Sequence, residues 1–145
     1  MNTQKNFRVM SAAAMIELLD ESDISGTGTS AMVLSLPPHL PEEYFENLVA
    51  EKRAASTIIT ANGLSMFRVI WQWTANKCIS VLLALAVAPP DKANFLCLCR
   101  GMDVLAAREK ASAILFSTGR RALVTQTMTW GASPFQIWMR KDYAV

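Results

Sequence analysis

The clearest pattern along the chain is a long apolar run, followed by an amphipathic segment and a shorter apolar run. The first run covers residues 79–88 (ISVLLALAVA) and is closed by Pro89-Pro90. Apolar residues then recur with helical spacing from Asn94 to Ala111, and residues 113–116 (AILF) form the second run. An apolar run bounded in this way is typical of a strand buried on both faces. The pattern predicts strand, loop, helix and strand, with a candidate ligand site where the first strand ends and the helix begins.

The preceding residues carry the pattern of a β-hairpin. Residues 56–60 (STIIT) are rich in β-branched side chains, and Asn62-Gly63 is a strong turn signal. Over residues 64–73, large apolar side chains then recur with a period close to two. We predict two strands, at 56–60 and 64–73, and a turn over residues 74–77 into the long strand. A single helix over residues 64–88 is the competing interpretation.

The N-terminal part is predicted to contain two helices and two short extended segments. Phe7–Met10 favours a short strand, and Ser11 is a suitable N-cap for a helix that runs to about Glu21. Residues 32–36 favour a short extended segment. Pro41 then suits the first position of a second helix, with acidic residues in its first turn. The predicted buried stripe of this helix consists of Phe45, Leu48 and Val49.

The C-terminal part favours strands. Residues 122–130 (ALVTQTMTW) have strand propensity, and residues 135–140 alternate between apolar and polar side chains. Gly101 lies inside the amphipathic segment, where glycine weakens a helix by about 1 kcal/mol relative to alanine. A break of the helix at Gly101 therefore stays open.

These elements predict an α/β (α+β) fold, with a mixed central sheet flanked by helices. At 145 residues, 52% of them apolar and 18% charged, the chain suits one domain over residues 1–145. No apolar run approaches the roughly 18–20 residues needed to span a bilayer. Acidic residues follow Ser11–Ala14 directly, so no signal peptide is expected there.

Charge and composition limit the chemistry. Residues 1–52 carry a net charge of −5 and residues 53–145 a net charge of +7. This asymmetry suits an anionic ligand on the C-terminal half, or packing between the two halves. The chain contains no nucleic-acid recognition motif, so nucleic acid is not an expected partner. Three cysteines without regular spacing indicate reduced thiols in a cytoplasmic compartment, and with His39 as the single histidine no metal site is expected.

The order of these elements resembles the GNAT superfamily of N-acetyltransferases. The resemblance depends on residues 85–89 (LAVAP), the helix after them, Ile114–Ser117, and the closing segment Phe135–Arg140 preceded by Gly131. It implies a GNAT-like fold, an acyl-CoA-dependent N-acyltransferase activity and acetyl-CoA as cofactor. The cofactor-binding residues that it implies are Leu85, Ala86, Val87, Lys92, Ala93, Asn94 and Phe95.

The chain departs from the family's pattern at two places. The expected pyrophosphate loop is glycine-rich in the family, whereas residues 91–95 (DKANF) contain no glycine. The long strand offers only Ser80 as a polar side chain, and no tyrosine lies between Arg120 and Trp130, so the catalytic residues are unknown. A weakly active or inactive acyltransferase would fit these departures.

A narrower resemblance links the chain to small GNAT-like assembly proteins of short-tailed bacteriophages, through Gly131, Phe135-Gln136 and the missing loop glycines. It implies a second hypothesis, a non-enzymatic virion assembly or protein-interaction protein that is virion-associated. Trp73, Trp130 or Trp138 would then anchor a protein partner, although core packing is the favoured interpretation of each. Oligomerisation stays open.

Overall fold

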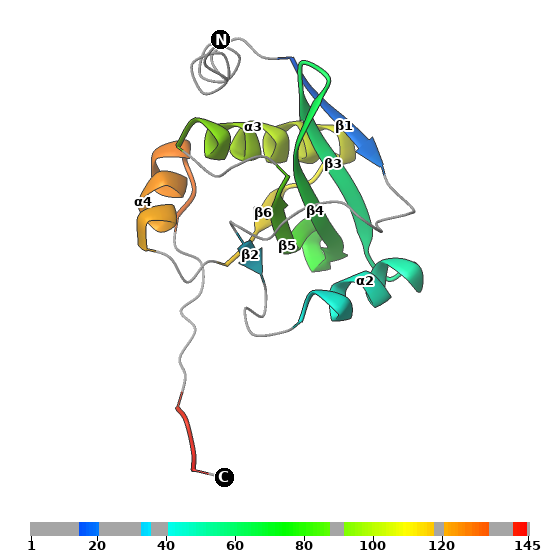
Figure 1. Cartoon of the computed structure of the whole chain (residues 1–145), viewed down its shortest axis with the longest axis vertical. Coiled ribbons are helices and arrows are strands. Elements are labelled where there is room, and N and C mark those ends of the chain that lie inside the picture. Colours follow the sequence, from blue (N-terminus) through cyan, green and yellow to red (C-terminus); the bar gives the residue numbers. More distant parts are fainter. Residues whose placement is uncertain are drawn as a thin grey trace.

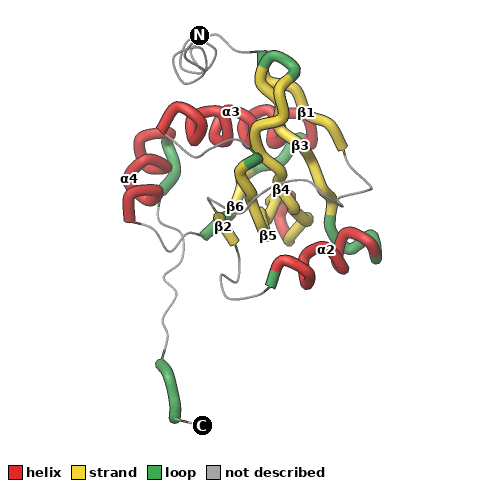
Figure 2. Tube along the Cα trace, viewed as in Figure 1, coloured by secondary structure: helices red, strands yellow, loops and turns green. Residues whose placement is uncertain are grey.

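The computed structural model describes residues 15–20, 33–35, 41–87, 92–117, 121–133 and 141–144. They form an α+β fold in which a mixed six-stranded sheet lies between helices (Figure 1). The sheet order is β1 (Ile16–Asp20), β3 (Ala55–Ala61), β4 (Leu64–Thr74), β5 (Cys78–Ala86) and β2 (Val33–Ser35), with β6 (Ala113–Leu115) also paired to β5. The helices are α2 (Glu42–Ala50), α3 (Lys92–Glu109) and α4 (Arg121–Trp130), and a single 3-10 turn, η1 (Ala75–Lys77), joins β4 to β5 (Figure 2). The α+β fold class predicted from the sequence is confirmed.

The hairpin β3–β4 is confirmed, and the alternative of one helix over residues 64–88 is wrong. The two strands pair antiparallel from Ala55↔Trp71 to Ala61↔Leu64. Asn62 (φ 49°) and Gly63 (φ 82°) both have left-handed backbone conformations, as a tight hairpin turn requires.

The long strand β5 is buried along almost its whole length, as its unbroken apolar run predicts. β4 pairs with one edge of β5 from Cys78 to Ala86. The other edge is shared by two strands: β6 pairs parallel with Cys78–Ser80, and β2 pairs antiparallel with Leu83–Leu85. The predicted extended segment at residues 32–36 is therefore confirmed by β2, which takes a place in the sheet.

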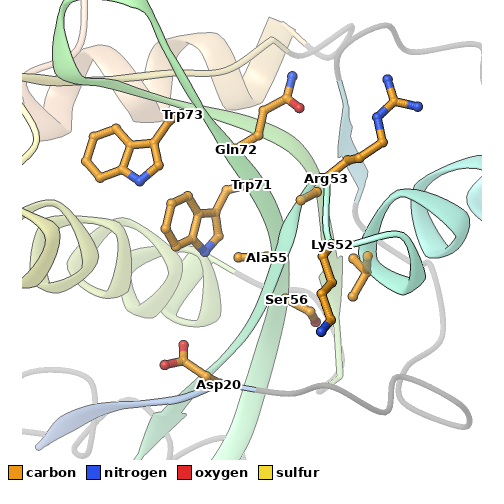
Figure 3. Close-up of a pocket in the computed structure, with 10 residues that line it drawn as sticks. Asp20, Lys52, Arg53, Ala55, Ser56, Trp71, Gln72 and Trp73 are labelled. Carbon is orange, nitrogen blue, oxygen red and sulfur yellow. The ribbon is translucent and has the colours of Figure 1, made fainter.

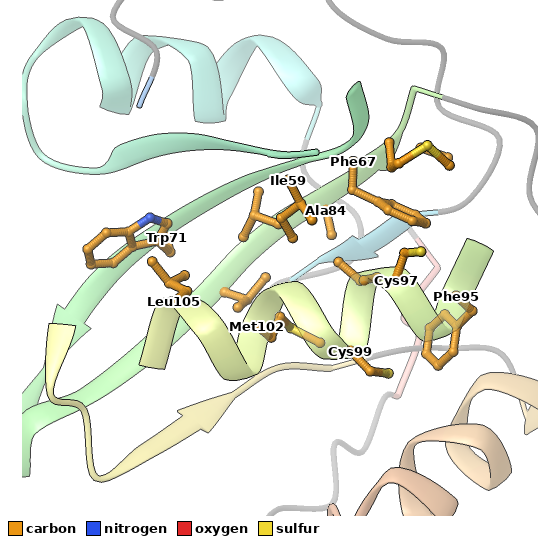
Figure 4. Close-up of a cluster of buried hydrophobic side chains, with 14 of the residues drawn as sticks. Ile59, Phe67, Trp71, Ala84, Phe95, Cys97, Cys99, Met102 and Leu105 are labelled. Atoms are coloured by element: carbon orange, nitrogen blue, oxygen red, sulfur yellow. The ribbon is translucent and has the colours of Figure 1, made fainter. Parts of the chain in front are cut away.

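Two cores fill the two faces of the sheet. On one face, α3 packs its apolar side on alternate residues of β3, β4 and β5 (Figure 4). On the other face, α2 contributes Phe45, Leu48 and Val49, which pack against Ile70 and the leucines of β5. The helix predicted from Pro41 is confirmed, with Pro41 as the N-cap residue before the first helical turn.

A buried arginine lies on the α2 face. Arg68 of β4 is 1% exposed, and its Nε donates a hydrogen bond to Ser56 Oγ at 3.2 Å. Its Nη1 lies 3.9 Å from Glu46 Oε1 on α2. A buried guanidinium needs such partners because desolvation of a charge is costly. Glu46 thus helps to fix α2 on the sheet.

The helix α3 continues through Gly101 without a break. A Cβ atom at this position would lie 2.5 Å from two side-chain carbons of Ile59 in β3. Gly101 therefore allows α3 to approach the sheet more closely than any larger residue would. This close packing offsets the low helix propensity of glycine.

Two predicted elements are wrong. Residues 16–20 form β1 rather than the end of a helix, because Ile16 and Leu18 face the α3 core while the segment pairs with Thr57–Ala61. Residues 121–130 form α4 rather than a strand. The buried Leu123 and Thr127 lie one helical turn apart, and this packing outweighs the strand propensity of the β-branched residues.

Some predicted elements lie outside the described residues. These are the strand at Phe7–Met10, the start of the helix at Ser11 and the closing strand at Phe135–Arg140.

Candidate functional site

The predicted cofactor site lies where β5 ends and α3 begins. Leu85 and Ala86 are buried in the sheet, and Phe95 is buried in the α3 core. Val87 is half-buried, and its N–H donates to the carbonyl of Met66 at 2.9 Å. Leu85 and Ala86 could therefore meet a cofactor only through backbone atoms.

The remaining predicted cofactor residues form the first turn of α3. Lys92, Ala93 and Asn94 are helical, and four residues separate Lys92 from Val87. A helix N-terminus offers backbone N–H groups that suit phosphate. The structure thus brings the predicted residues to one end of the sheet.

At this end of the sheet, the edge of β5 that does not pair with β4 is covered by another strand of the chain. β6 accompanies β5 only as far as Ser80, and β2 then occupies the edge along Leu83–Leu85. We therefore call this region the closed end of the sheet. It comprises the second half of β5, β2 and the first turn of α3.

A thiol on α3 is unsuited to nucleophilic chemistry. Cys99 is buried, and this burial raises the pKa of its thiol to about 12, with the Asp103 carboxylate acting in the same direction. At neutral pH Cys99 is therefore a protonated thiol, whereas catalytic cysteines react as thiolates.

A second region, at the opposite end of β4, is hollowed. A groove of about 680 Å³ lies where β3 begins, β4 ends and α2 runs into β3 (Figure 3). We call it the Trp73 groove. It is lined by Asp20, Val49, Lys52, Arg53, Ala54, Ala55, Ser56, Trp71, Gln72 and Trp73.

The floor of this groove is held by a chain of hydrogen bonds through three strands and a helix. Trp71 Nε1 donates to Thr57 Oγ1 at 3.0 Å, and Thr57 Oγ1 donates to Asp20 Oδ1 at 3.1 Å. Arg108 of α3 donates two hydrogen bonds to the same carboxylate, from Nη2 at 3.1 Å and from Nη1 at 3.3 Å. These hydrogen bonds fix the two side chains, because they join Trp71 of β4 to β3, and Asp20 of β1 to both β3 and α3.

Trp73 is the exposed aromatic residue of the groove. Trp71 is only 4% exposed, whereas Trp73 is 46% exposed. Their ring centroids are 6.0 Å apart at an interplanar angle of 82°, a favourable edge-to-face contact. The buried indole therefore supports the exposed one from one side.

Two basic residues line the groove, and two more lie in turns at the same end of the sheet. Figure 3 shows Lys52 and Arg53 on the side of Ala55 opposite the two indoles. Lys77, in the β4–β5 turn, accepts a backbone hydrogen bond from Ser112 at 2.9 Å, which brings the loop bearing Lys110 to the same end. Lys52, Lys77 and Lys110 all have left-handed backbone conformations, with φ between 56° and 59°. We call this region, with the Trp73 groove, the open end of the sheet.

The sequence identified this region only in part. It named Trp73 as a candidate anchor but favoured core packing, and the exposure of Trp73 shows that this preference is wrong. Trp130 is half-buried, and its Nε1 donates to Asp103 Oδ2 at 2.9 Å. Trp138 lies outside the described residues. A usable signal was the continuation of the alternating pattern to Trp73, four residues beyond Val69, the last position that a partner strand starting at Ser56 could cover across a turn at Asn62-Gly63.

In the part of the chain that the structure describes, no three His, Cys, Asp or Glu side chains gather as metal ligands. Among the same residues, no helix has the length and apolar character needed to cross a membrane.

Comparison with known proteins identifies no relative. No family model matches the chain, and no curated protein and no solved structure matches it. Likeness to the GNAT superfamily therefore stays a prediction from the sequence.

Proposed function

We propose that this protein is a non-enzymatic interaction protein on a GNAT-like fold, and that it binds a protein partner through the Trp73 groove. The observation that carries the proposal is Trp73 itself, 46% exposed at a groove of about 680 Å³ and supported by Trp71. Tryptophan is enriched among the residues that dominate binding energy in protein interfaces.

The surroundings of Trp73 suit such an anchor. Trp71 is fixed by its hydrogen bond to Thr57, so the ring that supports Trp73 does not need to be ordered when a partner binds. Preorganised side chains lose less conformational entropy on binding, and affinity improves accordingly.

The closed end supports the same proposal. β2 pairs with the edge of β5 where the acyltransferase hypothesis places the cofactor. An interaction protein needs no cofactor at that edge. The resemblance to assembly proteins of short-tailed bacteriophages suggests particle proteins as the class of partner.

Selection from a yeast-displayed library of short random peptides tests this proposal. We expect the protein to enrich peptides whose binding is weakened at least about tenfold by Trp73→Ala, a loss of roughly 1.4 kcal/mol. Leu64→Ala is the matched control, because Leu64 is 57% exposed but lies in the hairpin at the other end of β4. If no enriched peptide distinguishes Trp73→Ala from Leu64→Ala, the proposal is wrong.

We propose acyl-CoA binding at the closed end as a second candidate function. The observation that favours it is the parallel pair β5–β6 with α3 as the connection, since ligands of such sheets bind beyond the carboxyl ends of the strands. Lys92 and the backbone of Ala93, Asn94 and Phe95 would then contact the pyrophosphate, beyond Leu85, Ala86 and Val87.

Calorimetric titration with acetyl-CoA and with coenzyme A tests the second candidate. Micromolar binding that is lost in Lys92→Ala and kept in Lys77→Ala would support it, because Lys77 lies at the open end. No binding at millimolar ligand would remove it. A positive titration would justify an assay for transfer of the acetyl group to amines.

A further inference from the structure

The open end of the sheet has a stepped edge. β1 stops at Asp20, opposite Thr57, and the pairing of β3 with β4 stops at Ala55↔Trp71. β4 continues through Gln72, Trp73 and Thr74, which pair with β5 on their other side. No strand among the described residues pairs with the β3-side edge of these three residues.

The chain before β3 turns away from this edge. The backbone N–H groups of Arg53 and Ala54 both donate to the carbonyl of Leu48 in α2, at 2.8 and 3.2 Å. This segment therefore turns toward α2 instead of continuing β3 alongside Gln72. The space beside the edge is the Trp73 groove.

The charges around the edge favour an acidic partner. Asp20 and Glu109 each lie within 3.6 Å of Arg108, and Glu51 lies 3.5 Å from Arg53. Each described carboxylate of this end therefore has an arginine beside it. Lys52, Lys77 and Lys110 have no ion pair with any described residue, and because Arg108 is shared by two carboxylates, this end keeps an excess of two positive charges for a ligand.

We propose that the segment bound here is an extended acidic peptide that adds as a strand to the β4 edge at Gln72–Thr74. This inference rests on the proposed function and names the chemistry of the partner. Backbone hydrogen bonds to the edge supply affinity in this mode of recognition, and alternate side chains supply specificity. An apolar side chain of the peptide lies against Trp73, and its acidic side chains face Lys52, Lys77 and Lys110.

The strand edge favours a peptide over a nucleic acid. An unpaired edge presents alternating N–H and C=O groups, which an extended peptide matches and a phosphate backbone does not. The three lysines come from three separate loops and form no continuous basic stripe, whereas sequence-independent binding of nucleic acid depends on several phosphate contacts.

Fluorescence anisotropy with short labelled peptides tests the inference on the full chain. The probe alternates glutamate with valine around a central tryptophan. Two matched peptides replace glutamate by lysine, or place proline at positions that must donate to the β4 edge, and a single-stranded oligothymidylate serves as the nucleic-acid probe. We expect the acidic peptide to bind at least about tenfold more tightly than either matched peptide, a difference of about 1.4 kcal/mol or more.

Charge reversal on the protein provides the complementary test. Lys52→Glu and Lys77→Glu should each weaken the acidic peptide several-fold, and Trp73→Ala should weaken it at least about tenfold. Lys141→Glu is the control for net charge, because Lys141 is exposed and lies outside the described sheet. Added salt should reduce the effect of the lysine variants, because salt screens exposed charges.

Several outcomes would overturn the inference. Equal binding of the acidic and lysine peptides would remove the charge argument, and equal binding of the proline peptide would remove strand addition. Binding of the oligothymidylate alone would assign the surface to nucleic acid. A dimer that dissociates in Trp73→Ala during analytical ultracentrifugation would assign it to a second copy of the chain.

The peptide library separates this inference from the proposed function. Trp73-dependent peptides without an acidic bias would leave the proposed function intact and overturn the inference. A library that yields no Trp73-dependent peptide would overturn both.

Discussion

The two ends of the sheet differ although β4 and β5 run through both of them. At the closed end, the second half of β5 has a neighbour on each edge, and its side chains are buried between α2 and α3. At the open end, β4 extends beyond β3, and Trp73, Lys52 and Arg53 line the groove beside the unpaired edge. The comparison shows that the relative lengths of neighbouring strands decide where this fold leaves an unpaired edge among the described residues.

The largest expected effect comes from two tryptophans that are two residues apart. Trp71→Ala should lower the free energy of unfolding by about 3–5 kcal/mol, because a buried indole and its hydrogen bond to Thr57 are lost. Trp73→Ala should cost less than about 1 kcal/mol, because its side chain is half in solvent. Urea unfolding followed by circular dichroism measures both.

For peptide binding, we expect Trp73 to be the more important of the two tryptophans. Trp73→Ala should lose the peptide ligand while keeping stability. If Trp73→Ala destabilised the protein as much as Trp71→Ala, Trp73 would be a structural residue and the contrast between the two ends would fail.

A smaller effect is expected where α3 meets the sheet. Gly101→Ala improves helix propensity by about 1 kcal/mol, but its methyl group would overlap Ile59, and overpacking of a core costs about 1–3 kcal/mol. We expect a net loss of up to about 2 kcal/mol in urea unfolding.

A double-mutant cycle identifies the cause of this loss. In an Ile59→Ala background the overlap is absent, so Gly101→Ala should become neutral or stabilising by up to about 1 kcal/mol. An equal loss in both backgrounds would show that Gly101 is needed for a reason other than its contact with Ile59.

The sequence predicted the elements whose local pattern agrees with their packing. The β3–β4 hairpin, β5, α2 and α3 have strong turns, an unbroken apolar run or a clear helical stripe, and the structure confirms each of them. β1 and α4 were predicted wrongly because their side chains suit both helix and strand. In β1 the pairing with Thr57–Ala61 decides the outcome, and in α4 the burial of Leu123 and Thr127 decides it.

The position of the candidate site depends on tertiary contacts, which the hydrophobic periodicity of a single strand does not reveal. An alternating strand places Arg68 and Ile70 on the side opposite Val69, and because α2 covers that side, Arg68 and Ile70 are buried as fully as Val69. The unpaired edge at Gln72–Thr74 depends on where β3 starts, and that start depends on the bend of residues 53–54 toward Leu48. Such long-range contacts cannot be read from the residues of either strand alone.

The smallest expected effect is a difference in thiol reactivity between the two regions. Cys78 begins β5 at the open end and is half-exposed, whereas Cys97 and Cys99 are buried in the α3 core. Burial also raises the pKa of Cys99 to about 12, so its thiolate is scarce at pH 8. A chromogenic disulfide reagent should therefore label only Cys78 rapidly in the native protein and all three thiols in urea, and Cys78→Ser should abolish the rapid phase. Rapid native labelling of a second thiol would mean that α3 separates readily from the sheet. The core beneath α3 would then be as accessible to solvent as the groove beside Trp73.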